Sequence, residues 1–432
     1  MSVIKLNLNK KTGKIKPLHG GGQPPLVGIS DEHFHYLTEA GIPYSRLHDV
    51  GGAYGANRFV DIPNIFRDFD ADENDPASYD FTFTDILMSA LVKAGVKPYY
   101  RLGITIETYA NIKAYRTAPP ADFHKWARVC EHIIMHYNEG WANGFFYGVE
   151  YWEIWGEPDN RFDGKAPLWG GTDKEYFELY EITAKHLKAR FPDIKIGGYS
   201  CSGLYGIIPE DIRVFNTASK EELDGLLKFF HDFIDHVKKT SSPLDFFSWH
   251  SYSGVEGTAV MQKYIRKHLD ENGFTNTESH LNEYNPDAEH ENTAFHSAAV
   301  ASLLLAMQNE GVDLMCIYDM RWFGKRYAPL FNYKTDNPSG TYYSLAAFNE
   351  LYKLEDSVAL DCDEEGVYAV CASSGGQSAL MIANVSGRSV ELQIEGADLE
   401  NAKYLIINET RHLAWTPKPQ KIENETVLLI SW

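Results

Sequence analysis

Residues 149–198 read VEYWEIWGEPDNRFDGKAPLWGGTDKEYFELYEITAKHLKARFPDIKIGG, in which two short apolar runs flank a long helical stretch. The opening and closing runs are rich in aromatic and branched aliphatic residues, a composition typical of buried strands. The stretch between them, 173–190, follows Thr172, a favourable N-cap, and Glu175 stands three residues further on as its capping-box partner. A strand, a helix and a second strand in this order predict parallel strands joined by a helical crossover.

The same alternation of apolar runs and helical stretches extends on both sides of this unit. We expect strands at 26–29, 44–48, 97–102, 149–155, 194–198, 244–249, 280–283 and 314–318, and helices that include 83–94, 122–137, 173–190 and 293–308. Eight strands with intervening helices make up a (β/α)8 TIM barrel, an α/β fold. A doubly wound open sheet is the structural alternative, but no GxGxxG motif follows the first expected strand.

The two ends of the chain have a different pattern. Residues 1–18 include an apolar-polar alternation and a Thr-Gly turn, which predict a strand or a hairpin, and Gly20-Gly21-Gly22 then breaks the chain. After Leu354, short strand-like runs follow one another with turn signals and no helical pattern, as in a small all-β sandwich. We expect N-terminal strands at 1–18 that join this sandwich, a catalytic barrel at 19–352 and the β-sandwich domain at 353–432.

Composition and charge exclude several classes of function. The 432 residues carry 40 basic and 60 acidic side chains, a net charge of −20, which argues against nucleic acid or an anionic membrane surface as partner. No apolar run approaches the length of a membrane-spanning helix, and the first residues lack the apolar core of a signal peptide. The five cysteines form no CxxC pair, so a disulfide framework is not expected. These features favour a cytoplasmic protein, and a homo-oligomer is compatible with the sequence although no motif supports one.

Two carboxylates follow apolar strands, where a TIM barrel carries its working residues. Glu157 comes just after the strand at 149–155, and strand alternation predicts that Glu153, Trp155 and Glu157 share one side. Glu283 ends another expected strand. A carboxyl group held against tryptophan has a raised pKa, which suits a general acid near neutral pH. Cleavage of a glycosidic bond requires two carboxylates: one protonates the leaving oxygen, and the other attacks the anomeric carbon or activates a water.

The sequences around these carboxylates, WEIWGEPDN and LNEYNP, resemble those of the clan A retaining glycosidases. The best match within the clan is glycoside hydrolase family 39, which includes β-xylosidases and α-L-iduronidases. Weaker likeness elsewhere extends the resemblance over roughly residues 20–350. It implies that Glu157 is the acid/base and Glu283 the nucleophile, with retention of anomeric configuration and carboxyl groups about 5–5.5 Å apart.

The resemblance also implies residues that bind the substrate. His48 matches a position that contacts the glycone, and Tyr252 resembles a residue that orients the nucleophile. Trp155 and His250 belong to the matching strings, and Trp322 lies beyond the last strand, where it could stack under a sugar ring. For His48, Tyr252 and Trp322, packing without contact to substrate is the alternative.

The sequence departs from the family pattern at two positions. Gly156 replaces the asparagine that usually precedes the acid/base and donates to the sugar 2-hydroxyl, so we expect space there for a substituent or an altered orientation at C2. Arg101 stands in the strand at 97–102, where an acidic or neutral residue is expected. It could clamp a carboxylate or several hydroxyls, which keeps uronic-acid substrates open, or form a salt bridge with Asp49 or Glu107.

Two other kinds of function remain open. A metal-dependent hydrolase could use His33 and His35, but these lie in a segment that reads as a helix capped by Ser30, where residues two apart point in different directions. A barrel that binds glycans without cleaving them is the other. The sequence predicts a retaining exo-glycosidase, β-xylosidase-like, that acts on an oligosaccharide or small glycoside without cofactor or metal. Arabinosides, iduronides and 2-substituted sugars are alternative substrates.

Overall fold

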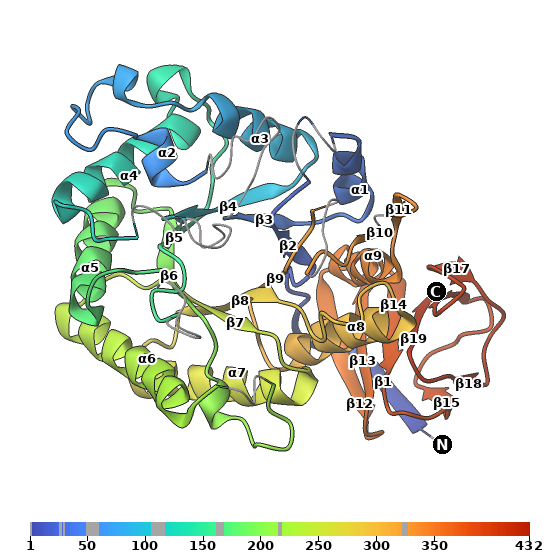
Figure 1. The fold of residues 1–432 in the computed structure, drawn as a ribbon. Helices are drawn as coiled ribbons and strands as arrows, with labels where there is room; N and C mark the ends of the chain where they lie inside the picture. Colours follow the sequence, from blue (N-terminus) through green and yellow to red (C-terminus); the bar gives the residue numbers. More distant parts are fainter. Residues whose placement is uncertain are drawn as a thin grey trace.

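Two bodies make up the molecule, a closed parallel barrel and a curled sheet beside it, and both chain ends lie on the sheet (Figure 1). The computed structural model describes residues 2–25, 28, 31–48, 60–104, 117–160, 168–214, 218–321, 327–332 and 334–432. Among these residues no helix is both long and apolar enough to cross a bilayer.

The barrel closes through eight parallel strands in chain order. They are β2 (Gly20–Gly22), β3 (Tyr44–Leu47), β4 (Lys97–Leu102), β5 (Tyr151–Ile154), β6 (Lys195–Cys201), β7 (Phe246–Ser251), β8 (Glu278–Tyr284) and β9 (Leu314–Ile317). The α-helices of the described residues are α1 (Phe34–Glu39), α2 (Ile62–Ile65), α3 (Thr82–Lys93), α4 (Phe123–Asn138), α5 (Asp173–Arg190), α6 (Lys220–Thr240), α7 (Val255–Glu271), α8 (Ala294–Asn309) and α9 (Gly340–Tyr352). Helices surround the strands on the outside (Figure 1), so the predicted TIM barrel is confirmed. Helix α5 has the predicted bounds and the predicted capping box between Thr172 and Glu175.

The first strand is not where the hydrophobic pattern places it. The glycine run that we expected to break the chain is itself β2, which pairs with β3 on one side and with β9 on the other. A Cβ at Gly20 would lie 2.8 Å from the carbonyl oxygen of Met315, and one at Gly21 would collide with the side chain of Met320. Close approach of neighbouring groups therefore requires glycine here, and a strand of glycines carries no hydrophobic signal. Of the expected strand at 26–29, all but Gly28 lies outside the described residues.

An aromatic layer fills the barrel interior toward its amino end. The cluster comprises Tyr44, Tyr99, Tyr151, Phe246, Leu314 and Cys316. Because inward positions recur every second residue along a strand, Arg46 on β3 and Glu153 on β5 form the next layer. A charged layer thus lies on an aromatic floor, at the side of the barrel where the strands end.

The second body is one nine-stranded sheet, mostly antiparallel. Its order is β17 (Ala414–Trp415), β16 (Lys403–Ile407), β19 (Thr426–Ser431), β14 (Gln377–Asn384), β13 (Val367–Ser374), β12 (Asp356–Cys362), β1 (Ser2–Lys14), β15 (Val390–Glu395) and β18 (Lys421–Ile422). Strand β1 pairs antiparallel with β12 and parallel with β15, so the N-terminal strand joins this sheet as predicted.

Each face of the sheet is buried against a different partner. Along β14, Leu380 and Ile382 belong to the sheet's own core, together with Ile4 of β1. The alternate residues, including Met381, belong to the large core of the barrel, and α8 and α9 contact β13 and β14. The curled sheet therefore encloses a second core and forms the predicted β-sandwich, which packs on the barrel helices.

Candidate active site

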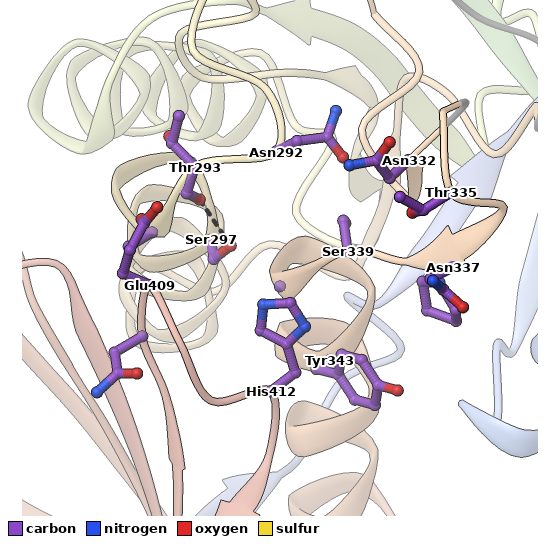
Figure 2. Close-up of a pocket in the computed structure, with 14 residues that line it drawn as sticks. Asn292, Thr293, Ser297, Asn332, Thr335, Asn337, Ser339, Tyr343, Glu409 and His412 are labelled. Carbon is purple, nitrogen blue, oxygen red and sulfur yellow. Dashed lines mark hydrogen bonds between the residues drawn. The ribbon is translucent and has the colours of Figure 1, made fainter.

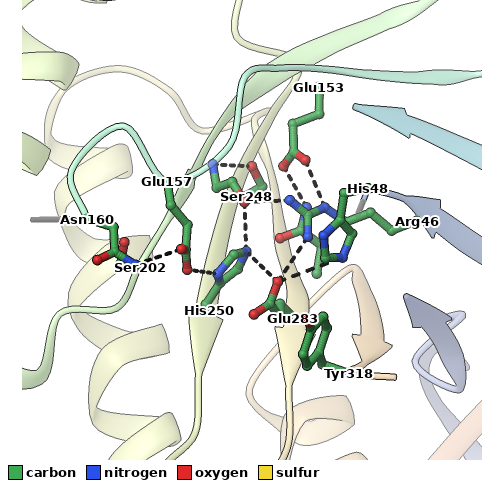
Figure 3. Close-up of polar contacts among 12 residues, drawn as sticks. Arg46, His48, Glu153, Glu157, Asn160, Ser202, Ser248, His250, Glu283 and Tyr318 are labelled. Carbon is green, nitrogen blue, oxygen red and sulfur yellow. Dashed lines mark hydrogen bonds and ion pairs between the residues drawn. The ribbon is translucent and has the colours of Figure 1, made fainter. Parts of the chain in front are cut away.

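Glu157 and Glu283 meet across the mouth of the barrel. Glu157 follows the end of β5, and Glu283 lies near the end of β8. A carboxylate oxygen of each, and a ring nitrogen of His250 from β7, all lie within 4.8 Å of one another. Figure 3 shows the imidazole of His250 between the two carboxylates. Only about a tenth of each glutamate side chain is exposed, so both carboxyl groups are largely shielded from solvent.

The imidazole of His250 links the two acids. Its Nδ1 lies 2.7 Å from Oε1 of Glu157, and its Nε2 lies 2.7 Å from the hydroxyl of Ser200 and 3.7 Å from Oε2 of Glu283. Asn160 donates from Nδ2 to the other carboxylate oxygen of Glu157 at 2.8 Å. By ligand type, Glu157, His250 and Glu283 could hold a cation, but protein donors already serve both carboxylates.

Glu283 accepts hydrogen bonds from Arg46 of β3 and from Tyr252, which follows β7. The hydroxyl of Tyr252 donates to Oε1 at 2.6 Å, Arg46 donates to Oε2 at 3.2 Å, and Nε2 of His48 lies 3.8 Å from Oε2. Burial raises the pKa of Glu283, the charge of Glu157 acts in the same direction, and His250, Arg46 and Tyr252 oppose them. The net pKa of Glu283 is above the ordinary glutamate value.

Arg46 is the central cation of the site, and the sequence motifs do not point to it. Its Nε donates to Glu153 at 2.8 Å, and Asn282 donates to the other oxygen of Glu153 at 2.6 Å. Burial opposes ionisation of Glu153, but the charge of Arg46 and the hydrogen bonds outweigh it and hold the pKa of this carboxyl below its ordinary value. Glu153 is therefore a fixed anion that anchors Arg46. Strand alternation is the sequence signal that could have identified Arg46 as a site residue. Arg46 stands two residues before His48, so both side chains are expected on the inward side of the barrel.

Comparison with known proteins identifies the family. The model of "Glycosyl hydrolases family 39" matches residues 38–325. The chain belongs to this family. A curated relative, the beta-xylosidase of Geobacillus stearothermophilus, is 22% identical over an alignment of 314 residues that covers 65% of this chain and 54% of the relative. The chain thus spans about half the length of this curated relative.

Solved structures share the whole fold at low sequence identity. A glucosidase from Croceicoccus marinus superposes with a TM-score of 0.78 at 20% identity, covering 100% of this chain and 98% of that one. A monomeric beta-xylosidase from Caulobacter crescentus CB15 superposes with a TM-score of 0.67 at 15% identity, covering 100% and 99%. Both likenesses show the architecture, a barrel with a β-sandwich.

Trp155 of this family 39 chain does not share the inward side of the strand with Glu153, contrary to the prediction from alternation. Strand β5 ends at Ile154, and Trp155 has a φ of 67°, so its side chain leaves the inward row that Glu153 occupies. The indole is 1% exposed, donates to the carbonyl of Leu168 at 3.0 Å and packs against Trp169. Trp155 is a core residue, and its assignment to substrate binding is wrong.

Gly156 and Arg101, the two departures from the family pattern, lie against each other. A Cβ at Gly156 would lie 3.0 Å from Cδ and 3.1 Å from a terminal nitrogen of Arg101. The expected open space beside Gly156 is therefore wrong, because Arg101 occupies it. Arg101 donates to Asp61 at 3.1 Å. The alternative partners Asp49 and Glu107 lie outside the described residues.

The remaining predicted residues divide into two groups. His48 is in the site, with its ring stacked near Tyr318, whereas Trp322 lies outside the described residues.

The two histidines of the metal alternative diverge: His33 is buried and its ring lies 2.7 Å from Asp336, and His35 is exposed on α1. The expected N-cap Ser30 also lies outside the described residues. His33 and His35 therefore do not converge on one point.

A second hollow lies outside this site. It has a volume of about 380 Å³ and is bounded by the first turns of α8 and α9, the hairpin of β10 (Phe331–Asn332) and β11 (Asn337–Pro338), and residues 408–412 of the sandwich (Figure 2). Its walls carry amides, hydroxyls, His412 and Glu409. Among the predicted site residues that the structure describes, none lines it.

Proposed function

We propose that this family 39 protein is a glycosidase that hydrolyses a terminal glycosidic bond with retention of configuration. The observation that carries the proposal is the approach of Glu157 and Glu283 to within 4.8 Å. Retaining enzymes hold their two carboxyl groups about 5–5.5 Å apart, whereas inverting enzymes leave about 6.5–9.5 Å to accommodate a water molecule. The short separation supports direct attack by one carboxylate.

In the first step Glu157 acts as the acid and Glu283 as the nucleophile. An oxygen of Glu283 bonds to the anomeric carbon while the bond from that carbon to the leaving oxygen breaks, and the leaving oxygen takes the proton of Glu157. In the second step the carboxylate of Glu157 takes a proton from water. The water oxygen bonds to the anomeric carbon as the bond to Glu283 breaks, which restores both acids and completes the double displacement.

The groups around Glu283 suit a nucleophile. Tyr252 and Arg46 donate to it and hold its orientation, and they offset part of the burial that raises its pKa. Charge-assisted hydrogen bonds of this kind are stronger than neutral ones. His250 contacts both acids and supports their separation. His48 and Tyr252 stand at the mouth with their polar ends near Glu283, where a glycone would bind.

A β-xyloside is the first substrate to test, because the curated relative is a beta-xylosidase. Arabinosides, iduronides and 2-substituted sugars follow as alternatives, and the glucosidase among the similar folds adds β-glucosides to the set. We propose that the natural substrate is an oligosaccharide or small glycoside in the cytoplasm, cut from one end. Arg101 is paired with Asp61, so an anionic group on the sugar is not needed to balance its charge.

A panel of aryl glycosides tests the proposal. It spans β-D-xyloside, β-D-glucoside, β-D-galactoside, both L-arabinosides and α-L-iduronide, and each is incubated with the wild type, Glu283→Ala and Glu271→Gln. Glu271 is 60% exposed at the end of α7 and serves as the matched carboxylate control. We expect the wild type and the control to hydrolyse at least one glycoside that Glu283→Ala does not hydrolyse. Silence of the wild type across the panel, with glycan binding retained in Glu283→Gln, would instead favour a barrel that only binds.

A further inference from the structure

The segment that carries Glu157 has an unusual backbone. Trp155 has a φ of 67° and Glu157 a φ of 45°, so two non-glycine residues on either side of Gly156 are left-handed. Such a conformation is strained for a residue with a side chain and persists only where the surroundings enforce it. Hydrogen bonds from the backbone NH of Trp155 to the carbonyl of Leu102, and from that of Glu157 to the carbonyl of Ser200, fix the segment at both ends. Gly156 lies between these two fixed points.

Arg101 supplies contacts at that point. Its side chain lies along Gly156, within 3.0–3.1 Å of the place where a Cβ would stand. A second glycine, Gly103, faces the same region: a Cβ there would lie 3.0 Å from Cα of Trp155 and 3.5 Å from Nε of Arg101. Two glycines, one after β4 and one after β5, thus admit the arginine side chain beside the bent segment. A side chain at either position would displace Arg101 or the backbone of Trp155.

The arginine is itself held in place. Its terminal nitrogen donates to Asp61 at 3.1 Å, and the side chains are 1% and 8% exposed. The backbone connects the same elements, because the NH of Ile62 donates to the carbonyl of Gly103 at 3.0 Å. Asp61 therefore fixes the guanidinium from the start of α2. A planar guanidinium held in this way is fixed in position and orientation, whereas a lysine ammonium would be a mobile point charge.

We propose that Arg101, anchored by Asp61, is a positioning residue for Glu157, and that glycine at position 156 is coupled to arginine at position 101. The inference rests on the proposed role of Glu157 as proton donor and deepens it. Arg101 acts through the backbone of Gly156: it keeps the Trp155–Glu157 bend at the angle from which the acid reaches the leaving oxygen. Displacement of a reacting group by about 1 Å can cost on the order of 100-fold in rate.

The dependence on the leaving group distinguishes positioning of the acid from a general structural role. A dinitrophenolate leaves without a proton, whereas an alkoxide or a simple phenolate requires one. For Arg101→Ala we expect kcat/KM to fall by at least about 30-fold with an unactivated aryl glycoside and by less than about threefold with the matching dinitrophenyl glycoside. Arg67→Ala is the control, because Arg67 forms an exposed pair with Asp80 in the same part of the chain. Its rates should equal those of the wild type with both substrates.

A double-mutant cycle tests the coupling. Gly156→Ala pushes a methyl group into Arg101 and should reproduce the selective loss with the unactivated substrate. In Arg101→Ala/Gly156→Ala the contact is absent, so the second substitution should cost less than about threefold beyond the first. Asp61→Asn keeps the shape of the anchor, provides a variant should Arg101→Ala not fold, and should give the same leaving-group pattern to a smaller degree.

Equal losses of kcat/KM with both leaving groups would overturn the inference. So would unchanged rates in Arg101→Ala or, should that variant not fold, in Asp61→Asn. Effects of Arg101→Ala and Gly156→Ala that simply multiply in the double variant would also overturn it. A wild type that hydrolyses neither substrate would instead contradict the proposed function itself. The melting temperature of each variant shows that the comparison is made on folded protein.

Discussion

The hydroxyl of Tyr252 donates a hydrogen bond of 2.6 Å to Oε1 of Glu283. This bond favours the ionised carboxylate and opposes the burial that raises its pKa. Glu283 must be ionised to attack, so the acidic limb of the kcat/KM profile should lie above the ordinary glutamate pKa. Tyr252→Phe removes the donor, and we expect the acidic limb to move to higher pH and kcat/KM at the optimum to fall roughly tenfold or more.

The control for this substitution is Tyr284→Phe. Tyr284 is next to Glu283 in the chain, and its buried hydroxyl has no hydrogen-bond partner among the described residues. Tyr284→Phe removes an equivalent oxygen that makes no contact with the carboxylate, so the pH profile of this variant should match that of the wild type. An acidic limb that stays in place in Tyr252→Phe would show that Glu283 does not depend on this bond.

Glu157→Ala tests the acid by its leaving groups. General acid catalysis contributes about 10²- to 10⁴-fold, and we expect a loss of that order with an unactivated glycoside. A dinitrophenyl substrate should still form the glycosyl-enzyme, and azide, a small anion, should restore turnover by replacing the activated water. Equal losses with both substrates and no effect of azide would exclude Glu157 as the acid/base.

Arg46 and Glu153 form a buried ion pair, and loss of Arg46 alone should cost more stability than loss of both charges. Arg46→Met leaves Glu153 charged and unpaired at the barrel centre, where removing one partner costs about 3–5 kcal/mol. Arg46→Met/Glu153→Gln removes both charges and should recover most of the free energy of unfolding, as measured by urea denaturation. A double variant no more stable than Arg46→Met would contradict the assignment of Glu153 as the anchored anion.

Asp159 gives the protein a pH-dependent stability. Burial, together with the charge of Glu157, raises the pKa of Asp159 to about 7, against the bonds from Ser202. The folded state therefore binds this proton more tightly than the unfolded chain, and the stability it contributes is lost as pH rises from about 4 to about 7. In Asp159→Asn this decline of the unfolding free energy should be absent, so the gap between variant and wild type should widen from pH 4 to pH 7. A constant gap would show that Asp159 titrates normally.

The barrel was predictable because its signals are local. Helix α5 begins at a capping box, and β4 is a six-residue run bounded by turns, so both have the predicted bounds. Strand β2 has no such signal, because neighbouring groups lie too close to glycines 20–22 to leave room for larger side chains. The motifs correctly placed Glu157 and Glu283 at strand ends. The two residues meet because the carboxyl ends of all parallel strands lie at the same end of the barrel.

Side-chain direction beyond a strand end was not predictable. Trp155 was assigned to the cleft by alternation, which stops at Ile154 when the backbone turns left-handed. Gly156 and Arg101 are far apart in the chain, and only the folded structure shows that they lie against each other. Arg46 was overlooked because a buried cation on a strand resembles an ordinary ion-pair residue until both of its carboxylate partners are placed.

The central claim, that Glu283 is the nucleophile of a retaining glycosidase, is tested most directly by trapping the intermediate. The 2-deoxy-2-fluoro analogue of whichever aryl glycoside the enzyme hydrolyses, with a dinitrophenolate leaving group, is incubated with wild type and with Glu283→Gln, and the digested protein is analysed by mass spectrometry. The account predicts one added fluoroglycosyl group, located on Glu283 and absent from the variant. An adduct on another residue, or inhibition of the wild type with no covalent adduct, would contradict it.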